Sequence, residues 1–163
     1  MKTVDSAWVG NLKVVPGQRY AIVYSRFNQT IVEGLVQGAV QCLAHHGAAD
    51  EQVELIEVPG AWELPLTVAR LAKSSRFNAI IALGAVIRGG TPHFEYVAGE
   101  ASSGLMRAQL DSLVPVAFGL LTTDNVEQAE ERSGQGRNNK GWDAALTVVE
   151  ALSLEKILAD NGC

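Results

Sequence analysis

The sequence predicts an α/β protein in which a parallel β-sheet is covered by helices on both faces. Two observations lead to this fold class. Short apolar segments alternate with segments of helical periodicity four times along the chain, which is the pattern of successive β-α units. In addition, every loop with candidate binding residues follows the end of a predicted strand. Ligands of such sheets bind beyond the carboxyl ends of the strands, so the sequence also predicts where a site would lie.

The composition narrows the class of protein. The chain has 163 residues, of which 47% are hydrophobic and 19% charged, and this suits one folded domain. Its net charge of -5 argues against a nucleic-acid-binding protein, and no apolar run is long enough to span a membrane. The N-terminal residues lack the apolar segment of a signal peptide, and Cys42 and Cys163 do not have metal-binding spacing. We therefore expect a cytoplasmic protein with reduced thiols.

The first predicted strand and helix follow an N-terminal segment without clear periodicity. We expect residues 1–19 to form an extended or disordered arm and residues 20–160 to form a single domain. The apolar segment YAIVY at 20–24 predicts a strand. Apolar residues then recur at every fourth position, which predicts a helix, and we expect Asn28 to cap its start and Gly47 to follow its end.

The second unit begins with the segment VELIEV at 53–58, where alternating apolar and polar residues predict a strand with one drier face. A loop at 59–63 leads into the next predicted helix. Its apolar positions are Leu64, Val68, Leu71 and Ala72. Pro65 is compatible with this helix only in the first turn.

The third unit begins with β-branched and small residues at 79–87, which predict a fully buried strand. The loop RGGTPH follows and ends at a predicted helix of about residues 92–110. In this loop Thr91 is a good N-cap, and Pro92 fits the first helical position because no N–H group is needed there.

The same loop has the residue types of an anion site with an acid/base group beside it. Free N–H groups at a helix start, next to Gly89 and Gly90, suit a bound phosphate. Arg88 adds a cation, and His93 is a residue type that titrates near neutral pH. A structural turn with a surface histidine stays open as the alternative, because the loop matches neither the Walker A nor the dinucleotide-binding pattern.

The fourth unit contains the strand VAFGLL at 116–121 and a short polar helix with the sequence VEQAEER. Gly134, Gly136 and the pair Asn138-Asn139 interrupt the periodicity. A last helix is predicted from the spacing of apolar residues at Trp142, Ala145, Leu146, Val149 and Leu152.

Two more loops at strand ends carry candidate binding residues. Phe27 directly follows the first strand, where it could stack on a flat ring or form a local hydrophobic staple. Glu63, beside Trp62, could accept hydrogen bonds from ligand hydroxyls or could simply be an acid favoured at a helix start. We expect His45 and His46 to be solvated at a helix end rather than to bind a metal.

Five segments, in this order and at matching spacing, resemble the 6,7-dimethyl-8-ribityllumazine synthase family. They are RFNQTIVEGLVQGAV, VPGAWELP, ALGAVIRGGTPHFEYVAGEAS, VPVAFGLLTTDNVEQAEER and NNKGWDAAL. The resemblance runs from about Tyr20 to the end of the last helix. It implies a flavodoxin-like three-layer αβα sandwich with a four-stranded parallel sheet.

The resemblance also implies an activity. Enzymes of this family condense 5-amino-6-(D-ribitylamino)uracil with 3,4-dihydroxy-2-butanone 4-phosphate in the penultimate step of riboflavin biosynthesis. The products are 6,7-dimethyl-8-ribityllumazine, phosphate and water. The family needs no metal and no organic cofactor. Its subunits form pentamers, which are sometimes stacked as decamers or closed into icosahedral shells, and each active site lies between neighbouring subunits of a pentamer.

The resemblance assigns roles to matching residues of this chain. His93 would move protons. The substrate-binding residues would be Phe27 on the pyrimidine ring, Ala61, Trp62 and Glu63 on the ribityl chain, Ala85, Val86 and Ile87 through their backbone, and Phe118 from the adjacent subunit. The phosphate-binding residues would be Gly90 and Thr91, together with Arg132 of the adjacent subunit. Arg88 and Lys140 are further candidates.

One segment departs from the family pattern. The family often reads GTKAGNKG after the arginine that matches Arg132, whereas this chain reads GQGRNNKG. The mid-loop lysine is therefore absent, and Arg137 is the nearest cation. Because the family's assemblies differ at this loop, the resemblance leaves pentamer, decamer and icosahedral shell open.

Two other functions stay open as alternatives. A non-catalytic lumazine- or flavin-binding relative would use Phe27 and Glu63 and leave His93 and Arg132 idle. A generic flavodoxin-like signalling or nucleotide domain has less support, because the chain has no Walker lysine and no acidic cluster after the first strand.

Overall fold

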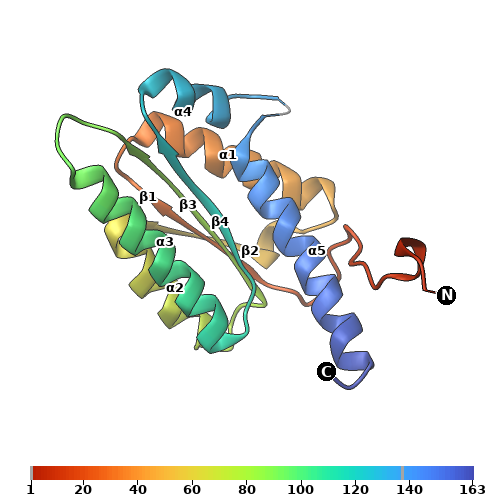
Figure 1. The fold of residues 1–163 in the computed structure, drawn as a ribbon. Helices are drawn as coiled ribbons and strands as arrows, with labels where there is room; N and C mark the ends of the chain where they lie inside the picture. The colour runs from red at the N-terminus through yellow and green to blue at the C-terminus, as the bar shows by residue number, and fades with distance from the viewer. Residues whose placement is uncertain (1, 137) are drawn as a thin grey trace.

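The computed structural model describes residues 2–136 and 138–163, and within them a four-stranded parallel sheet lies between two layers of helices (Figure 1). The strand order is β2-β1-β3-β4. The strands are β1 (Tyr20–Ser25), β2 (Val53–Val58), β3 (Ala79–Ile87) and β4 (Val116–Thr123). The predicted three-layer α/β fold of the flavodoxin-like type is therefore confirmed.

The helices are divided between the two faces of the sheet (Figure 1). One layer contains α2 (Leu64–Ala72) and α3 (His93–Ser112), and the other contains α1 (Gln29–His45), α4 (Val126–Ser133) and α5 (Lys140–Asp160). Short 3-10 turns are η1 (Val4–Ser6), η2 (Asp50–Gln52) and η3 (Ala61–Glu63). None of the helices in the described part of the chain has both the length and the apolar character needed to cross a membrane.

Each sheet face has its own apolar core, and β1 contributes to both. Tyr20 and Ile22 pack in the core beneath α1, α4 and α5, whereas Ala21 and Val23 pack in the core beneath α2 and α3. Successive side chains of a strand point to opposite faces, so a strand that is covered on both sides reads as a continuous apolar run. This is why β1 and β3 were recognisable from the sequence.

The start of α3 differs from the prediction. The helix begins at His93, and Pro92 occupies the N-cap position with φ -71° and ψ 11°. Thr91 is therefore not the N-cap, and no side chain caps this helix start. A proline at the cap contributes no N–H group of its own, so the first amide of the helix belongs to His93.

Asparagine residues act differently at two other helix starts. Asn28 occupies the predicted N-cap position of α1, but its side chain makes no capping hydrogen bond. Asn139 caps α5 with its side-chain oxygen, which accepts from the backbone N of Gly141 at 2.9 Å and of Trp142 at 3.1 Å. This cap explains why α5 begins at Lys140, before the apolar positions that predicted it.

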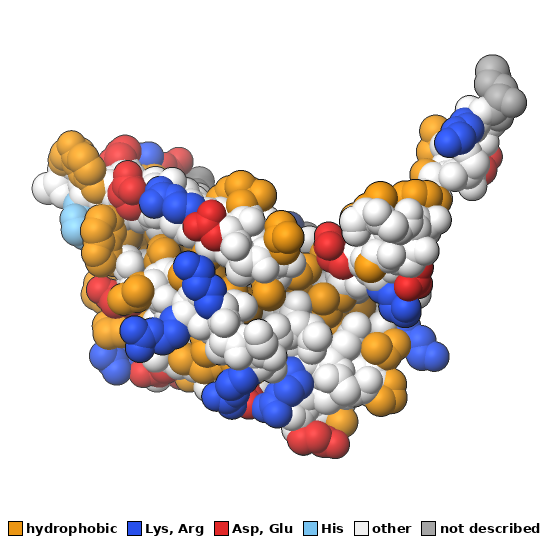
Figure 2. Space-filling view, turned by 90° about the horizontal axis from the view of Figure 1, so that it is seen from below, with side chains coloured by type: hydrophobic (Ala, Val, Ile, Leu, Met, Phe, Trp, Pro, Cys, Tyr) orange, Lys and Arg blue, Asp and Glu red, His pale blue; other side chains and the backbone are white. Residues whose placement is uncertain are grey.

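The N-terminal segment crosses α5 and then stands away from the rest of the molecule (Figures 1 and 2). At Gly10 it approaches α5 so closely that a Cβ atom would lie 2.1 Å from the carbonyl oxygen of Glu150. The backbone N of Asn11 donates to Ser153 Oγ at 3.0 Å. Trp8 and Val9, further out, are exposed, and Figure 2 shows hydrophobic side chains on this projecting segment. The division into an arm and a single domain stays a prediction.

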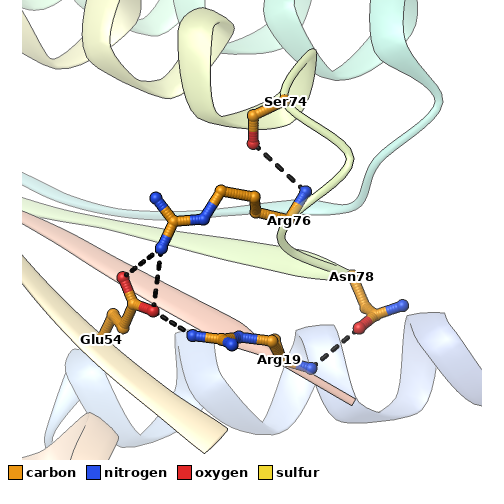
Figure 3. Close-up of polar contacts among 5 residues, drawn as sticks. All are labelled: Arg19, Glu54, Ser74, Arg76 and Asn78. Carbon is orange, nitrogen blue, oxygen red and sulfur yellow. Dashed lines mark hydrogen bonds and ion pairs between the residues drawn. The ribbon is translucent and has the colours of Figure 1, made fainter. Parts of the chain in front are cut away.

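Two arginines pair with Glu54 near the amino-terminal ends of the strands (Figure 3). Arg76 Nη2 lies 3.3 Å from Glu54 Oε1, and Arg19 also pairs with this carboxylate. The backbone N of Arg19 donates to Asn78 Oδ1 at 2.8 Å. Because these side chains are partly exposed, the ion pairs contribute little to stability. The cluster lies at the opposite end of the strands from the candidate site described below.

Ser25, the last residue of β1, has a buried hydroxyl with no hydrogen-bond partner in the described part of the chain. A buried hydroxyl without a partner loses its hydration without compensation. We expect Ser25→Ala to leave the free energy of unfolding unchanged or to raise it by up to about 1 kcal/mol. Denaturant unfolding of the purified variant measures this change.

Thr123→Val is the matched comparison for Ser25→Ala, because Thr123 is also buried but its Oγ1 donates to the backbone oxygen of Asn125 at 2.9 Å. Removing this satisfied hydroxyl is expected to lower the free energy of unfolding by about 1 kcal/mol. An equal loss in the two variants would contradict the interpretation of Ser25.

Candidate active site

The candidate site begins where β1 ends before its neighbour β3. The β1–β3 pairing runs only from Tyr20↔Ala79 to Tyr24↔Leu83. On the other side of β3, the pairing with β4 continues to Ile87↔Thr123. The last residues of β3, from 84 to 87, therefore have a strand neighbour on the β4 side but not on the β1 side.

This difference in strand length directs backbone groups of β3 toward the site. The backbone N of Arg88 donates to Thr123 O at 2.8 Å, on the β4 side. Successive residues in a parallel ladder present their N–H and C=O groups to opposite neighbours. The backbone groups of Ile87 and Ala85 therefore point to the β1 side, where they can pair with side chains or with a ligand.

A hollow of about 650 Å³ lies at this edge of the sheet, a size that suits a small-molecule ligand. It brings together predicted site residues from three loops and from β3. They are Phe27, Ala61, Trp62, Glu63, Ala85, Val86, Ile87, Thr91 and His93. Phe27, Glu63 and His93 are far apart in the sequence, and they meet here because the carboxyl ends of parallel strands lie at one edge of the sheet.

Two large aromatic side chains at the hollow are unusually exposed. Phe27 is 72% exposed and Trp62 is 58% exposed, although aromatic side chains of this size normally contribute to the apolar core. The backbone around Phe27 is nevertheless held in place: Arg26 N donates to Val58 O at 2.8 Å, and Phe27 N donates to Pro59 O at 3.2 Å. The ring is thus presented to solvent from an ordered loop.

Glu63 is placed by the turn η3 between β2 and α2. Its backbone N donates to Gly60 O at 3.2 Å, and the following residue, Leu64, is fully buried and anchors the start of α2. The Glu63 side chain is half-buried and lines the hollow. A carboxylate in this position can accept hydrogen bonds from ligand hydroxyls.

The guanidinium of Arg88 forms ion pairs with two carboxylates of the same chain. It pairs with Glu95 in the first turn of α3 and, at 3.0 Å, with Asp124 after β4. It also lies 4.3 Å from the ring centroid of Phe94. The hydrogen bonds to Glu95 and to Asp124 raise the pKa of Arg88. The hydrogen bond from Arg88 lowers the pKa of Glu95. Arg88 therefore links the glycine loop to α3 and to the end of β4, and two carboxylates neutralise its charge.

The remaining predicted residues lie elsewhere. Gly90 is exposed at the tip of the loop but does not line the 650 Å³ hollow. Phe118, Arg132 and Lys140 line a second hollow of about 450 Å³, between the edge strand β4 and the helices α4 and α5. Phe118 is 53% exposed there. A single chain thus does not bring these three residues together with Phe27 and His93.

The two cations of the second hollow have internal partners. Arg132 Nη1 donates to the backbone oxygen of Gln128 at 2.9 Å, and Lys140 Nζ pairs with Asp143 Oδ2 at 2.8 Å. Both side chains are nearly half exposed, so an anion from outside the chain can still reach them.

No group of three His, Cys, Asp or Glu side chains suited to a metal ion occurs in residues 2–136 and 138–163. The rings of His45 and His46 lie 5.7 Å and 6.1 Å from the ring of Trp142. His46 Nδ1 is 2.7 Å from the backbone oxygen of Cys42. Burial, with a smaller effect of Asp143, raises the pKa of the Cys42 thiol to about 12. This cluster is therefore a packing contact between α1 and α5.

Five further residues that line the 650 Å³ hollow had no predicted binding role: Asn28, Gly60, Phe94, Tyr96 and Val97. The last three belong to the first turns of α3. Tyr96 and Val97 follow His93 by three and four positions and so lie on its side of the helix, where helical spacing could have identified them, whereas Phe94 is the next residue and points in a different direction. Nothing in the local pattern around Asn28 indicated that its side chain turns away from the helix it begins.

The comparison with known families agrees with this geometry. The model of the family described as 6,7-dimethyl-8-ribityllumazine synthase matches residues 17–156 of the 163-residue chain. The match spans all four strands and both hollows, and it confirms the resemblance seen in the sequence. The chain therefore belongs to the 6,7-dimethyl-8-ribityllumazine synthase family, whose members are enzymes of riboflavin biosynthesis that act on small-molecule substrates.

Proposed function

We propose that this protein is a transferase that condenses 5-amino-6-(D-ribitylamino)uracil with 3,4-dihydroxy-2-butanone 4-phosphate. The products are 6,7-dimethyl-8-ribityllumazine, phosphate and water, and the reaction is the penultimate step of riboflavin biosynthesis. The observation that carries the proposal is that Phe27, Glu63 and His93 line one hollow. A flat ring, a polyol chain and a proton-transfer step each require one of these residue types.

The pyrimidine substrate would occupy the space above the end of β3. Phe27 stacks on its ring, as exposed aromatic side chains do with planar ligands. The backbone groups of Ala85 and Ile87, which point to the β1 side, pair with the edge of the uracil, and Val86 contributes to the lining of the same space. Glu63 accepts hydrogen bonds from the ribityl hydroxyls, with Ala61 and Trp62 alongside the chain.

The phosphate substrate would bind at the glycine loop. Gly90 and Thr91 bind the phosphate near the start of α3, where amide groups and the helix dipole favour an anion. His93 moves protons during Schiff-base formation, phosphate loss and ring closure. Holding the two substrates together removes much of the entropic cost of their reaction. No step in this scheme requires a metal or an organic cofactor.

We propose that a neighbouring subunit completes each site. Phe118 and Arg132 line a separate hollow of the same chain, so in the proposed scheme they serve the site of an adjacent copy. Such sites, each shared by two adjacent copies, fit a homo-oligomer built from pentamers, and Arg132 then neutralises the phosphate of the neighbouring site. Lys140 is a further candidate in this role.

The proposal places the enzyme in the cytoplasm, with residues 20–160 as one domain, residues 1–19 as an arm, and neither nucleic acid nor membrane as a partner.

The purified protein mixed with both substrates is expected to form lumazine, which is followed by its absorbance and fluorescence. Omitting either substrate, or omitting the protein, gives the background rate. Binding of lumazine without its formation above that background would instead support a non-catalytic binding protein. Light scattering on the same sample measures the size of the assembly.

Arg132→Ala is expected to raise the KM for the butanone phosphate by about tenfold to a hundredfold, because a charge-assisted contact to phosphate is lost. The KM for the pyrimidine should change by less than about threefold, since the proposed contact of Arg132 is with the phosphate and not with the pyrimidine. Steady-state kinetics with each substrate varied in turn separates the two constants. Arg70→Ala, which removes an exposed arginine of α2, is the control. A selective loss of pyrimidine binding in Arg132→Ala would contradict this assignment.

A further inference from the structure

We propose that Asn28 is a positioning residue that holds the Phe27 ring and the end of β3 in the arrangement needed for the pyrimidine substrate. This inference rests on the proposed function. Asn28 Nδ2 donates to the backbone oxygen of Ala85 at 2.8 Å, across 57 positions of sequence. The contact therefore joins the loop that carries Phe27 to the strand whose backbone is proposed to bind the uracil edge.

The Asn28 side chain takes the place of a missing strand neighbour. The β1–β3 ladder ends at Tyr24↔Leu83, and the next backbone groups of β3 that face β1 are those of Ala85. Asn28 Nδ2 supplies the hydrogen bond that a further residue of β1 would have supplied. The ladder is thus extended by one bond, and Ile87 is the next residue of β3 whose backbone groups point to the β1 side.

The backbone at Asn28 allows this contact. Its φ of 59° and ψ of 47° lie in the left-handed region, which asparagine tolerates better than most residues. The side chain consequently leaves the N-cap of α1 uncapped and points instead to β3. Asparagine commonly caps helices with its side chain. Here the side chain of Asn28 forms a hydrogen bond with β3 instead of with the first turn of α1.

The described part of the chain covers little of the Phe27 ring. Its side chain is 72% exposed, and its backbone N donates to Pro59 O at 3.2 Å. The neighbouring pair Arg26–Glu57 is at the surface, with exposed fractions of 61% and 42%. The backbone bonds of Arg26 and Phe27 tie this loop to the end of β2. The partly buried hydrogen bond from Asn28 ties the same loop to β3.

Two substitutions at position 28 separate the side-chain bond from the backbone conformation. Asn28→Asp keeps the size and the tolerance of the left-handed region but replaces the donor with a carboxylate oxygen that faces Ala85 O. Asn28→Gly keeps the backbone conformation and removes the side chain. We expect both variants to raise the KM for the pyrimidine by about tenfold, while the KM for the butanone phosphate changes by less than about threefold.

Asn161→Asp is the chemically matched control. Asn161 Nδ2 donates to the backbone oxygen of Ile157 at 2.8 Å, at the exposed end of α5, so the same exchange is made far from the site. Neither KM should change in this variant. A purely structural role of Asn28 would lower the midpoint of thermal unfolding and the fraction of active enzyme without a selective change in the pyrimidine KM.

The outcomes distinguish this proposal from the proposed function. If wild-type protein forms lumazine and Asn28→Asp has the wild-type pyrimidine KM, the positioning role is overturned and the function stands. If wild-type protein forms no lumazine, the proposed function fails. Crystal structures of wild type and Asn28→Asp then test the positioning role of Asn28 by itself. A displaced Phe27 loop in Asn28→Asp supports the positioning role, and an unchanged loop overturns it.

Discussion

His93→Ala is expected to lower the rate of lumazine formation by about a hundredfold, while the affinity for the product changes by less than about threefold. General acid–base catalysis contributes about a hundredfold or more, and we expect an effect at the lower end because the side chain of His93 is exposed and water can replace part of its proposed role. As the first residue of α3, it lines the hollow without contributing to either core. Its removal should therefore leave folding unchanged.

Single-turnover kinetics and a fluorescence titration with the lumazine product measure these two quantities separately. His45→Ala is the control, because His45 is also an exposed histidine of a helix but does not line the hollow. Unchanged turnover in His93→Ala would remove His93 from the mechanism. A large loss of product affinity with unchanged turnover of bound substrate would instead assign it a binding role.

Gly141→Ala is expected to lower the free energy of unfolding by about 3 kcal/mol. A Cβ atom at this position would lie 1.9 Å from the carbonyl oxygen of Leu35 and 2.6 Å from its carbonyl carbon. Both atoms belong to the backbone of α1, so the clash cannot be relieved by a side-chain rotation and the helices α1 and α5 must separate. Two glycines of α1 allow further close contacts: a Cβ atom would lie 2.3 Å from Ser133 O at the end of α4 if added at Gly34, and 2.2 Å from Asn139 Oδ1 before α5 if added at Gly38.

The matched control for Gly141→Ala is Gly99→Ala in α3. Gly99 is exposed and helical, and a Cβ atom there would meet no atom within 4 Å. This variant is expected to raise the free energy of unfolding by about 0.5 to 1 kcal/mol, because alanine restricts the unfolded chain more than glycine. Denaturant unfolding compares the variants, with light scattering to show that the assembly is the same. Similar stability changes in both variants would contradict the close packing of α1 on α5.

The sequence predicted the elements better than their ends. Helical and strand periodicities depend on residues close in the chain, and they correctly indicated β1, β3 and α1. The start of α3 was placed one residue early, because the choice between Thr91 and Pro92 as N-cap depends on how the loop meets the helix. The strand β4 extends two residues beyond the prediction, since its pairing with β3 continues to Ile87↔Thr123.

The candidate site was predicted as a set of residues, but its contacts were not. Arg88 was a candidate cation for phosphate, and the structure shows its charge paired with Glu95 and Asp124. Asn28 was a candidate helix cap, and its side chain bonds to Ala85 instead. Both partners of each pair come from separate elements, so the choice of partner depends on strand register and loop direction, which local patterns do not specify.

By itself the sequence determined the order of strands and helices along the chain and the family. It also determined that binding residues gather at the carboxyl ends of the strands. These properties follow from short-range periodicity and from motifs that are continuous in the chain. Only the tertiary structure decided that Phe27, Glu63 and His93 share one hollow while Phe118 and Arg132 line another. The physical reason is that β1 ends before β3 and that α4 and α5 pack beside β4. Such relations depend on how whole elements pair and pack rather than on any one segment.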